Sequence, residues 1–186
     1  MNFKYLILFS TMWFFTCAGG NSLVTIELDG KTTEISSRVS KGDSMIVKMT
    51  SFHENGEISS IKNYKKGVPH GKWLWFNEKG ERDTLRLYKD SLLNGKSRAW
   101  HANGEMLFQQ EFKNGKKIGV WQTWYDDKKI RSWSEYSDDL LHGIVAEWYS
   151  NGILSRLTNY SEGKRNKTAS EWSPKGNLVS HRVYIE

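Results

Sequence analysis

The chain has 186 residues, which predicts one domain, and carries a formal net charge of +6 with 26% charged residues. Its one cysteine, Cys17, excludes an intrachain disulfide framework and a cysteine-based metal site. The basic residues are interleaved with acids rather than gathered in a stripe, which argues against nucleic acid as a partner.

The first predicted element is a leader over residues 1–18. Lys4 precedes an apolar run that ends at Phe15, shorter than the roughly 20 residues that a membrane-spanning helix needs. A basic start, a short apolar run and small residues after it are typical of a secretory signal, with a candidate cleavage site at 16–18. Lipidation of Cys17 at a bacterial lipoprotein site and an uncleaved membrane anchor stay open as alternatives. We expect an exported protein, secreted or lipid-anchored in a bacterial envelope, that meets a membrane only through this leader or a lipid anchor.

Residues 19–51 are predicted to form a linker followed by a degenerate first repeat or a cap. The alternating stretches VTIEL and MIVKM are separated by Asp29-Gly30 and by residues 41–43, and Asp-Gly between alternating runs indicates a hairpin. The regular pattern of the rest of the chain does not extend cleanly into this stretch. A terminal unit of a stacked array is expected to differ in this way because one of its sides has no neighbour.

The rest of the chain, residues 52–186, repeats itself every 24 residues. A first aromatic column consists of Phe52, Phe76, Trp100, Trp124, Trp148 and Trp172. A second column, the tyrosine column, consists of Tyr64, Tyr88, Phe112, Tyr136, Tyr160 and Tyr184. Each residue of the first aromatic column begins a unit, so the region holds units one to five and a partial unit six.

Glycine marks the turns of each unit. One glycine column holds Gly56, Gly80, Gly104, Gly152 and Gly176, with Lys128 as the exception, and another holds Gly71, Gly95, Gly119 and Gly143, broken by Lys167. Turns this frequent leave no room for ordinary helices, and the segments between them are rich in strand-forming residues. We expect one strand to end at the first aromatic column, a glycine turn, a second strand with the tyrosine column, and a longer loop such as 65–71. Apolar residues three apart, at 58, 61 and 64, predict a β-bulge in each second strand.

Stacking allows each hairpin to cover the aromatic residues of its neighbour, which a single hairpin cannot do alone. The predicted fold class is therefore all-β, an elongated single-layer array of stacked β-hairpins over residues 52–186. With neighbouring strands about 4.8 Å apart, the array should be about 50–60 Å long.

The pattern Tyr-x-x-Gly-x-x-x-Gly-x-Trp identifies a resemblance at this point. It occurs intact at Tyr64, Gly67, Gly71 and Trp73, and again, with phenylalanine in the tyrosine column, at Phe112, Gly115, Gly119 and Trp121. It resembles the MORN repeat in its longer bacterial variant, found in proteins named for the antitoxin component of a toxin–antitoxin module. The resemblance covers residues 52–186 and implies stacked β-hairpins in an elongated, twisted sheet. It implies no enzymatic activity.

A search for reactive groups predicts no catalytic, cofactor or metal site. His53 and His101 share a column but lie two units apart, about 19 Å, too far to bind one zinc ion. The same argument separates His70 from His142, which are three units apart. The acid pairs at 126–127 and 138–139 lack the spacing of an EF-hand, so a calcium site there is the less favoured alternative to solvated turns. An enzyme with a site assembled from scattered polar residues is likewise less favoured.

The tryptophans are the remaining candidates for function. Those of the first aromatic column are predicted to be core, whereas Trp73, Trp75 and Trp121 vary from unit to unit and are candidate partner-binding residues. Trp73 and Trp75 alternate with Leu74 and Phe76, so the two pairs face opposite ways. One face is then a candidate aromatic strip, unless loops fold over it.

The leading hypothesis is an exported, non-enzymatic scaffold that binds a protein partner along its sheet, with an antitoxin-like immunity role as a special case. The alternative is carbohydrate or cell-wall binding through the strip.

Overall fold

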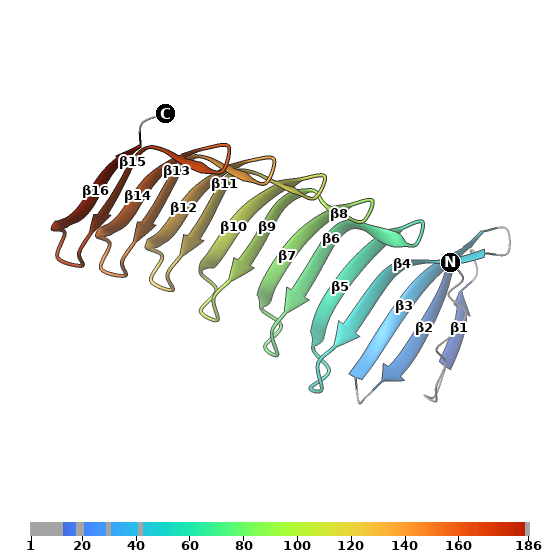
Figure 1. Ribbon diagram of the computed structural model, residues 1–186. Helices are drawn as coiled ribbons and strands as arrows, with labels where there is room; N and C mark the ends of the chain where they lie inside the picture. Colours follow the sequence, from blue (N-terminus) through green and yellow to red (C-terminus); the bar gives the residue numbers. More distant parts are fainter. Residues whose placement is uncertain (1–12, 18–20, 29–30, 41–42, 185–186) are drawn as a thin grey trace.

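A computed structural model of the chain shows one open antiparallel sheet (Figure 1). It describes residues 13–17, 21–28, 31–40 and 43–184, with side chains over 32–35 and 46–184. Every regular element in these ranges is a strand: β1 (Trp13–Cys17), β2 (Asn21–Leu28), β3 (Lys31–Ser40), β4 (Asp43–Phe52), β5 (Ile58–Lys65), β6 (Val68–Phe76), β7 (Arg82–Lys89), β8 (Leu92–Leu93), β9 (Gly95–Trp100), β10 (Met106–Lys113), β11 (Lys116–Trp124), β12 (Ile130–Ser137), β13 (Leu140–Trp148), β14 (Leu154–Ser161), β15 (Lys164–Trp172) and β16 (Leu178–Tyr184). Except for β8, which pairs with β7 alone, each strand lies beside its neighbours in chain order.

The predicted fold class, an all-β single-layer array of stacked hairpins, is confirmed (Figure 1). The chain exposes 13197 Å², whereas a compact monomer of its 21.6 kDa would expose about 9,200 Å². No described side chain is less than 2% exposed, and the buried apolar residues are the small Ala99 and Ala146. A single layer with little core leaves both of its faces available for contacts.

The two aromatic columns occupy the predicted places in the strands. Every residue of the first aromatic column is the last residue of a strand, from Phe52 in β4 to Trp172 in β15. The tyrosine column lies near the end of the following strands, for example Tyr64 in β5. Trp75 and Phe76 are consecutive in β6, so their side chains leave the sheet on opposite faces.

The predicted bulge is present in the second strand of every unit. In β5, Ile58 pairs with Phe52 and Ser60 pairs with Ser51, so that Ser59 has no partner. The equivalent unpaired residues in the later units are Asp83, Leu107, Arg131, Ser155 and Val179. An extra residue shifts the alternation by one. Ile58 and Ile61 can therefore share a face although they are three residues apart.

The expectation of a longer loop at 65–71 is wrong. Lys65 still belongs to β5 and β6 begins at Val68, so two residues connect the strands. Both of them, Lys66 and Gly67, have positive φ, at 53° and 76°. Two positive φ angles are typical of the type I′ turn, whose twist fits that of the paired strands. The other units hold Asp90-Ser91, Asn114-Gly115, Asp138-Asp139 and Glu162-Gly163 at these positions, so glycine marks only some of the turns.

The longer connection is the one at the glycine turn, with five residues from 53 to 57. His53 N donates to Glu57 O at 2.8 Å, and Gly56 N donates to His53 O at 3.0 Å. The same pair of backbone bonds recurs in all six units. Gly56 has a φ of +85°, the conformation that this position requires and that Lys128 adopts at 70° in unit four.

Residues before unit one extend the sheet with β1 to β3 and with β4, which ends at the first residue of unit one. Leu28 at the end of β2 pairs with Lys31, and Ser40 pairs with Asp43, so that β2 to β4 are antiparallel neighbours, as the alternating stretches predicted. Residues 29–30 and 41–42 themselves lie outside the described residues. Of the expected leader, residues 13–17 form β1 and pair with β2, and the rest of 1–18 lies outside the described residues. Within the ranges that are described, no helix is long and apolar enough to cross a membrane.

Backbone hydrogen bonds fasten neighbouring units at the edge formed by the two-residue turns. The second turn residue donates its N–H to a carbonyl of the preceding unit, as from Ser91 to Pro69 at 2.9 Å. Three further bonds of this kind run from Gly115 to Leu93, from Asp139 to Lys117 and from Gly163 to Leu141. This edge is therefore tied from each unit to the next.

Side chains fasten the opposite edge, at the glycine turns. His53 Nε2 lies 2.9 Å from Phe76 O and His101 Nε2 lies 3.0 Å from Trp124 O, one unit further on. The hydroxyls of Tyr125 and Tyr149 donate to the equivalent carbonyls, those of Trp148 and Trp172. An asparagine amide two residues further along adds a second bond in units one, three and five: Asn55 to Glu78 O, Asn103 to Asp126 O and Asn151 to Pro174 O.

The junction between units two and three differs from these. Asn77 turns its side chain inward and bonds within its own turn, to Lys79 N and to Glu81. Among the side chains that the structure describes, none bonds across this edge to the turn of unit three. Arg82 instead lies 5.7 Å from the ring of Trp100, a cation–π contact across the junction.

Candidate functional site

One row of directly paired residues runs along one face of the sheet. We call it the central row, and it consists of Ser60, Trp75, Thr84, Ala99, Phe108, Thr123, Ser132, Glu147, Arg156, Glu171 and Ser180. Residues that pair directly across antiparallel strands present their side chains on the same face. The row therefore shows what each unit presents there: Trp75 in unit one, small side chains in unit two, Phe108 in unit three, and then hydroxyl and charged groups.

Trp73, a predicted partner-binding residue, packs tightly between neighbouring strands. Its ring centroid lies 5.4 Å from that of Tyr64 and 4.7 Å from that of Tyr88. Its Nε1 donates to Asn63 O at 2.8 Å. The indole therefore joins three strands, and most of its surface is already engaged within the sheet.

Trp121 repeats this arrangement two units further along. Its centroid lies 5.1 Å from Phe112 and 4.9 Å from Tyr136, and its Nε1 donates to Glu111 O at 3.1 Å. Lys117 lies 4.7 Å from the Trp121 ring. Trp121 is thus packed between neighbouring strands in the same way as Trp73. It lies two units from Trp73 and Trp75, so the structure does not bring the three predicted residues together.

Trp75 forms the more open part of the predicted strip. Its centroid lies 6.0 Å from that of Trp73, so the two indoles share a face as predicted. Lys62 Nζ lies 5.4 Å from the Trp73 ring and 5.9 Å from the Trp75 ring, and the Arg86 guanidinium lies 5.5 Å from Trp75. We call Lys62, Trp73, Trp75 and Arg86 the aromatic–cation cluster. No second layer covers it in the part of the chain that the structure describes.

The two cations of this cluster were missed at the sequence level. Lys62 and Arg86 both pair directly with Trp73, from the strands on its two sides. Each stands two residues before the tyrosine column, a position that holds Gln110, Ser134 and Thr158 in units three to five and Arg182 in unit six. The recurrence of a basic residue in units one and two was the available signal.

Burial raises the pKa of two phenols in the tyrosine column. It raises the pKa of Tyr64, which packs on Trp73. It also raises the pKa of Tyr136, which packs on Trp121, with a smaller contribution from Tyr160. Both phenols therefore stay neutral beyond the usual range of tyrosine.

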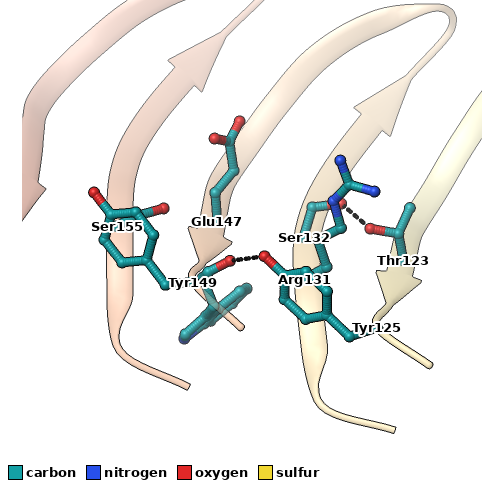
Figure 2. A pocket seen from close by; sticks show the side chains of 8 residues that line it. Thr123, Tyr125, Arg131, Ser132, Glu147, Tyr149 and Ser155 are labelled. Atoms are coloured by element: carbon teal, nitrogen blue, oxygen red, sulfur yellow. Dashed lines mark hydrogen bonds between the residues drawn. The ribbon is translucent and has the colours of Figure 1, made fainter. Parts of the chain in front are cut away.

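Further along the same face, the central row opens into a groove over unit four (Figure 2). The hollow has a volume of about 590 Å³ and is lined by Thr123, Tyr125, Arg131, Ser132, Glu147, Trp148, Tyr149 and Ser155. Thr123 stands where unit one has Trp75, in the residue before the first aromatic column. The bulge brings Arg131 and Ser155 into the lining beside the paired residues of the row.

The walls of this groove are held by hydrogen bonds. The Tyr125 hydroxyl donates to Trp148 O at 2.7 Å, and the hydroxyls of Thr123 and Ser132 lie 2.7 Å apart (Figure 2). A second hollow of about 480 Å³ adjoins the first and shares Glu147, Tyr149 and Ser155 with it. The hollow therefore recurs from one unit to the next.

The other polar residues considered in the sequence serve the turns and the junctions between units. Asp127 accepts from Lys129 N, and the Lys129 side chain lowers the pKa of Asp127. Asp139 accepts from Lys117 N, and Asp138 lies 3.7 Å from Lys116 Nζ. No group of three potential metal ligands occurs among the described residues.

Comparison with known families places three segments of the chain. Residues 47–66, 93–114 and 141–162 match the model of the MORN repeat variant. Each segment contains the five-residue glycine turn of unit one, three or five, whose asparagine bonds to the next unit. No curated protein matches the chain. The matches support a repeat scaffold and leave its partner open.

Proposed function

We propose that the chain is an exported, non-enzymatic scaffold that binds a protein partner at the aromatic–cation cluster. The observation that carries this proposal is Trp75 between Lys62 and Arg86, on a sheet face with no second layer. Tryptophan and arginine are enriched among residues that dominate the energy of protein interfaces. Two cations beside apolar rings favour a partner surface that places carboxylates around an apolar centre.

A glycan at the same strip is the less supported alternative. Stacking of a sugar requires a free ring face, but Trp73 is packed between Tyr64 and Tyr88, and Lys62 and Arg86 lie against Trp75. An acidic protein surface can form ion pairs with these cations and contact the remaining ring surface. We therefore assign this cluster to a protein.

Capture of the partner tests the proposal. The chain is used to purify partners from the envelope fraction of its native cell, followed by mass spectrometry. We expect one stoichiometric protein that is lost with Trp75→Ala and with Lys62→Glu. Lys72→Glu is the matched control, because Lys72 precedes Trp73 in β6 and its exposed side chain leaves from the opposite face. Loss of the partner with Lys72→Glu as well, or retention with both cluster variants, would contradict the proposal.

An immunity role is a special case of this function. The resemblance to proteins named for an antitoxin component motivates it, and an acidic toxin would suit the cations of the cluster. The identity of the captured protein decides it. A toxin whose activity the chain inhibits would support immunity, whereas a partner without toxic activity would leave the scaffold function and exclude this case.

Export through the leader has its own test. Intact mass of the protein recovered from its cell should correspond to loss of the leader, either unmodified or with a lipid on Cys17. Cys17→Ser should abolish the lipid form and release the protein from the membrane fraction. Recovery of the full unprocessed chain from the cytoplasm would rule out export.

A further inference from the structure

We infer that the groove over unit four binds a linear, neutral polysaccharide, at a site separate from the aromatic–cation cluster. The groove and the hollow beside it share Tyr149, Glu147 and Ser155, so they form one continuous depression along the array. A ligand that follows it must be a chain whose own repeat matches that of the hairpins.

The spacing of the hollows suits a polysaccharide. Each unit contributes two strands, so equivalent groups recur every 9–10 Å or so along the sheet. A β-1,4-linked disaccharide has a similar length, and such chains are straight. Successive disaccharides can therefore meet Tyr125 and Glu147 in one hollow and their equivalents, Tyr149 and Glu171, in the next.

Two tyrosines provide ring surfaces at this spacing. The hydroxyls of Tyr125 and Tyr149 are both bound to backbone carbonyls, at 2.7 Å and 3.0 Å. These bonds fix the rings and satisfy their polar ends, while the apolar ring surface lines the groove (Figure 2). Rigid aromatic walls with a few placed polar groups are typical of small-ligand sites, and ring faces pack well on the C–H faces of sugars.

The polar lining fits a ligand that carries hydroxyls and no net charge. Thr123, Ser132 and Ser155 can both donate and accept hydrogen bonds, Glu147 can accept, and Arg131 can donate. The charges of the two hollows balance: Glu147 and Glu171 would repel an anionic chain, and Arg131 and Arg156 a cationic one. Arg156 lies 3.5 Å from Glu147 and 3.6 Å from Glu171. A neutral polyol is attracted by both kinds of group and repelled by neither.

An extended peptide fits this place less well. Peptides that bind to sheets do so mainly through main-chain hydrogen bonds at a free edge. The groove lies over β11 to β14, and each of these strands is paired on both sides. The backbone is therefore already used, and side chains alone form the lining.

The equivalent residues of other units provide substitutions that should fill or alter the groove. Thr123→Trp would place there the residue that unit one carries at the same position, Trp75, on a backbone that already accepts it. Gln122→Trp is its control, since the adjacent side chain leaves from the opposite face of β11. Arg131→Ser likewise copies Ser155, its equivalent in unit five.

Isothermal titration of the full chain with chitohexaose and with cellohexaose tests the inference. We expect at least one of these neutral oligosaccharides to bind, Thr123→Trp to weaken binding about tenfold or more, and Arg131→Ser to weaken it several-fold. Circular dichroism confirms that each variant is folded, and Gln122→Trp should bind as the unsubstituted chain does.

Three outcomes would overturn the inference. They are the absence of binding to both sugars, unchanged binding in Thr123→Trp, and loss of binding in Trp75→Ala with Thr123→Trp unaffected. The last would move the sugar to the aromatic–cation cluster. Protein capture by that cluster is measured separately, so either proposal can fail while the other stands.

Discussion

Units one and four share a backbone but present different surfaces on the same face. Around unit one, Trp75 fills the central row and Trp73 fills the gap between the tyrosines on both sides. Around unit four, Thr123 and Glu147 stand at the position that holds Trp75 in unit one, and the sheet has a hollow there of about 590 Å³. A repeat scaffold can thus vary its surface by side-chain size at fixed positions, without a change in its hairpins.

The largest expected effect is a loss of stability, and it should be greater in unit one than in unit four. Trp73→Ala should lower the free energy of unfolding by about 2–3 kcal/mol, because the half-buried indole joins three strands. Val145→Ala, at the equivalent position of unit four, should cost about 1 kcal/mol for the methyl groups it removes. Urea unfolding followed by circular dichroism measures both. Equal losses of unfolding free energy in the two variants would contradict the view that unit one depends on the packing of Trp73 between the tyrosines.

A second comparison uses the glycines that precede these positions. Gly143 has a φ of +94°, and a Cβ there would crowd the Glu135 side chain, including its Cβ at 3.3 Å. Gly71 has a φ of +83°, but its nearest contact would be Asn63 Cβ at 3.7 Å. Each alanine should cost about 1–2 kcal/mol for its backbone conformation. Gly143→Ala should cost more than Gly71→Ala, and thermal melting that ranks them the other way would refute the crowding.

The side-chain bonds between units should have smaller effects. Asn103→Ala removes the bond to Asp126 O and the acceptor for Glu105 N, which should cost about 1 kcal/mol. Lys79→Asn places the same residue in unit two, where this bond is lacking, and should stabilise the chain by about 0.5 kcal/mol. Hydrogen exchange near residues 77–81 and 101–105 should slow in Lys79→Asn. No slowing there would mean that the second unit cannot adopt the bonded turn.

The smallest effect is on pH dependence. Because burial raises the pKa of Tyr64 and Tyr136, their stabilising contribution is complete below the usual pKa of tyrosine, about 10, and is lost as pH rises through the folded pKa. Tyr184 is the contrast, since Arg165 lowers its pKa. Tyr136→Phe should therefore reduce the loss of stability at alkaline pH, whereas Tyr184→Phe should not. Melting temperatures across alkaline pH, with tyrosinate absorbance, measure this difference.

Much of the fold could be predicted from the sequence because its signals are local and recur. The aromatic columns predicted the strand ends, and the spacing of Ile58 and Ile61 predicted the bulge. The two-residue turns were harder to recognise: Asn114-Gly115 carries the usual signal, but Asp90-Ser91 and Asp138-Asp139 carry no glycine although all four residues have positive φ. There the paired strands hold the backbone in place of local preference.

The candidate sites could be predicted less well than the fold, because they depend more strongly on strand register. Sequence alternation placed Trp73 and Trp75 on one face, but Lys62 and Arg86 joined them only through strand pairing. The groove was missed altogether, because its lining is small and polar and comes from three units. Small polar residues give no sequence signal of a groove, because the empty volume between them exists only in the folded structure.

The sequence by itself determined the period, the hairpin array and the place of each aromatic column, since these follow from residue spacing within one unit. The tertiary structure decided which side chains of different units meet. Strand register and the bulge set that choice, as in the separation of the predicted Trp121 from Trp75 and in the approach of Arg82 to the Trp100 ring at 5.7 Å. A contact between strands is fixed by pairing along the whole sheet, and no stretch of sequence contains that information alone.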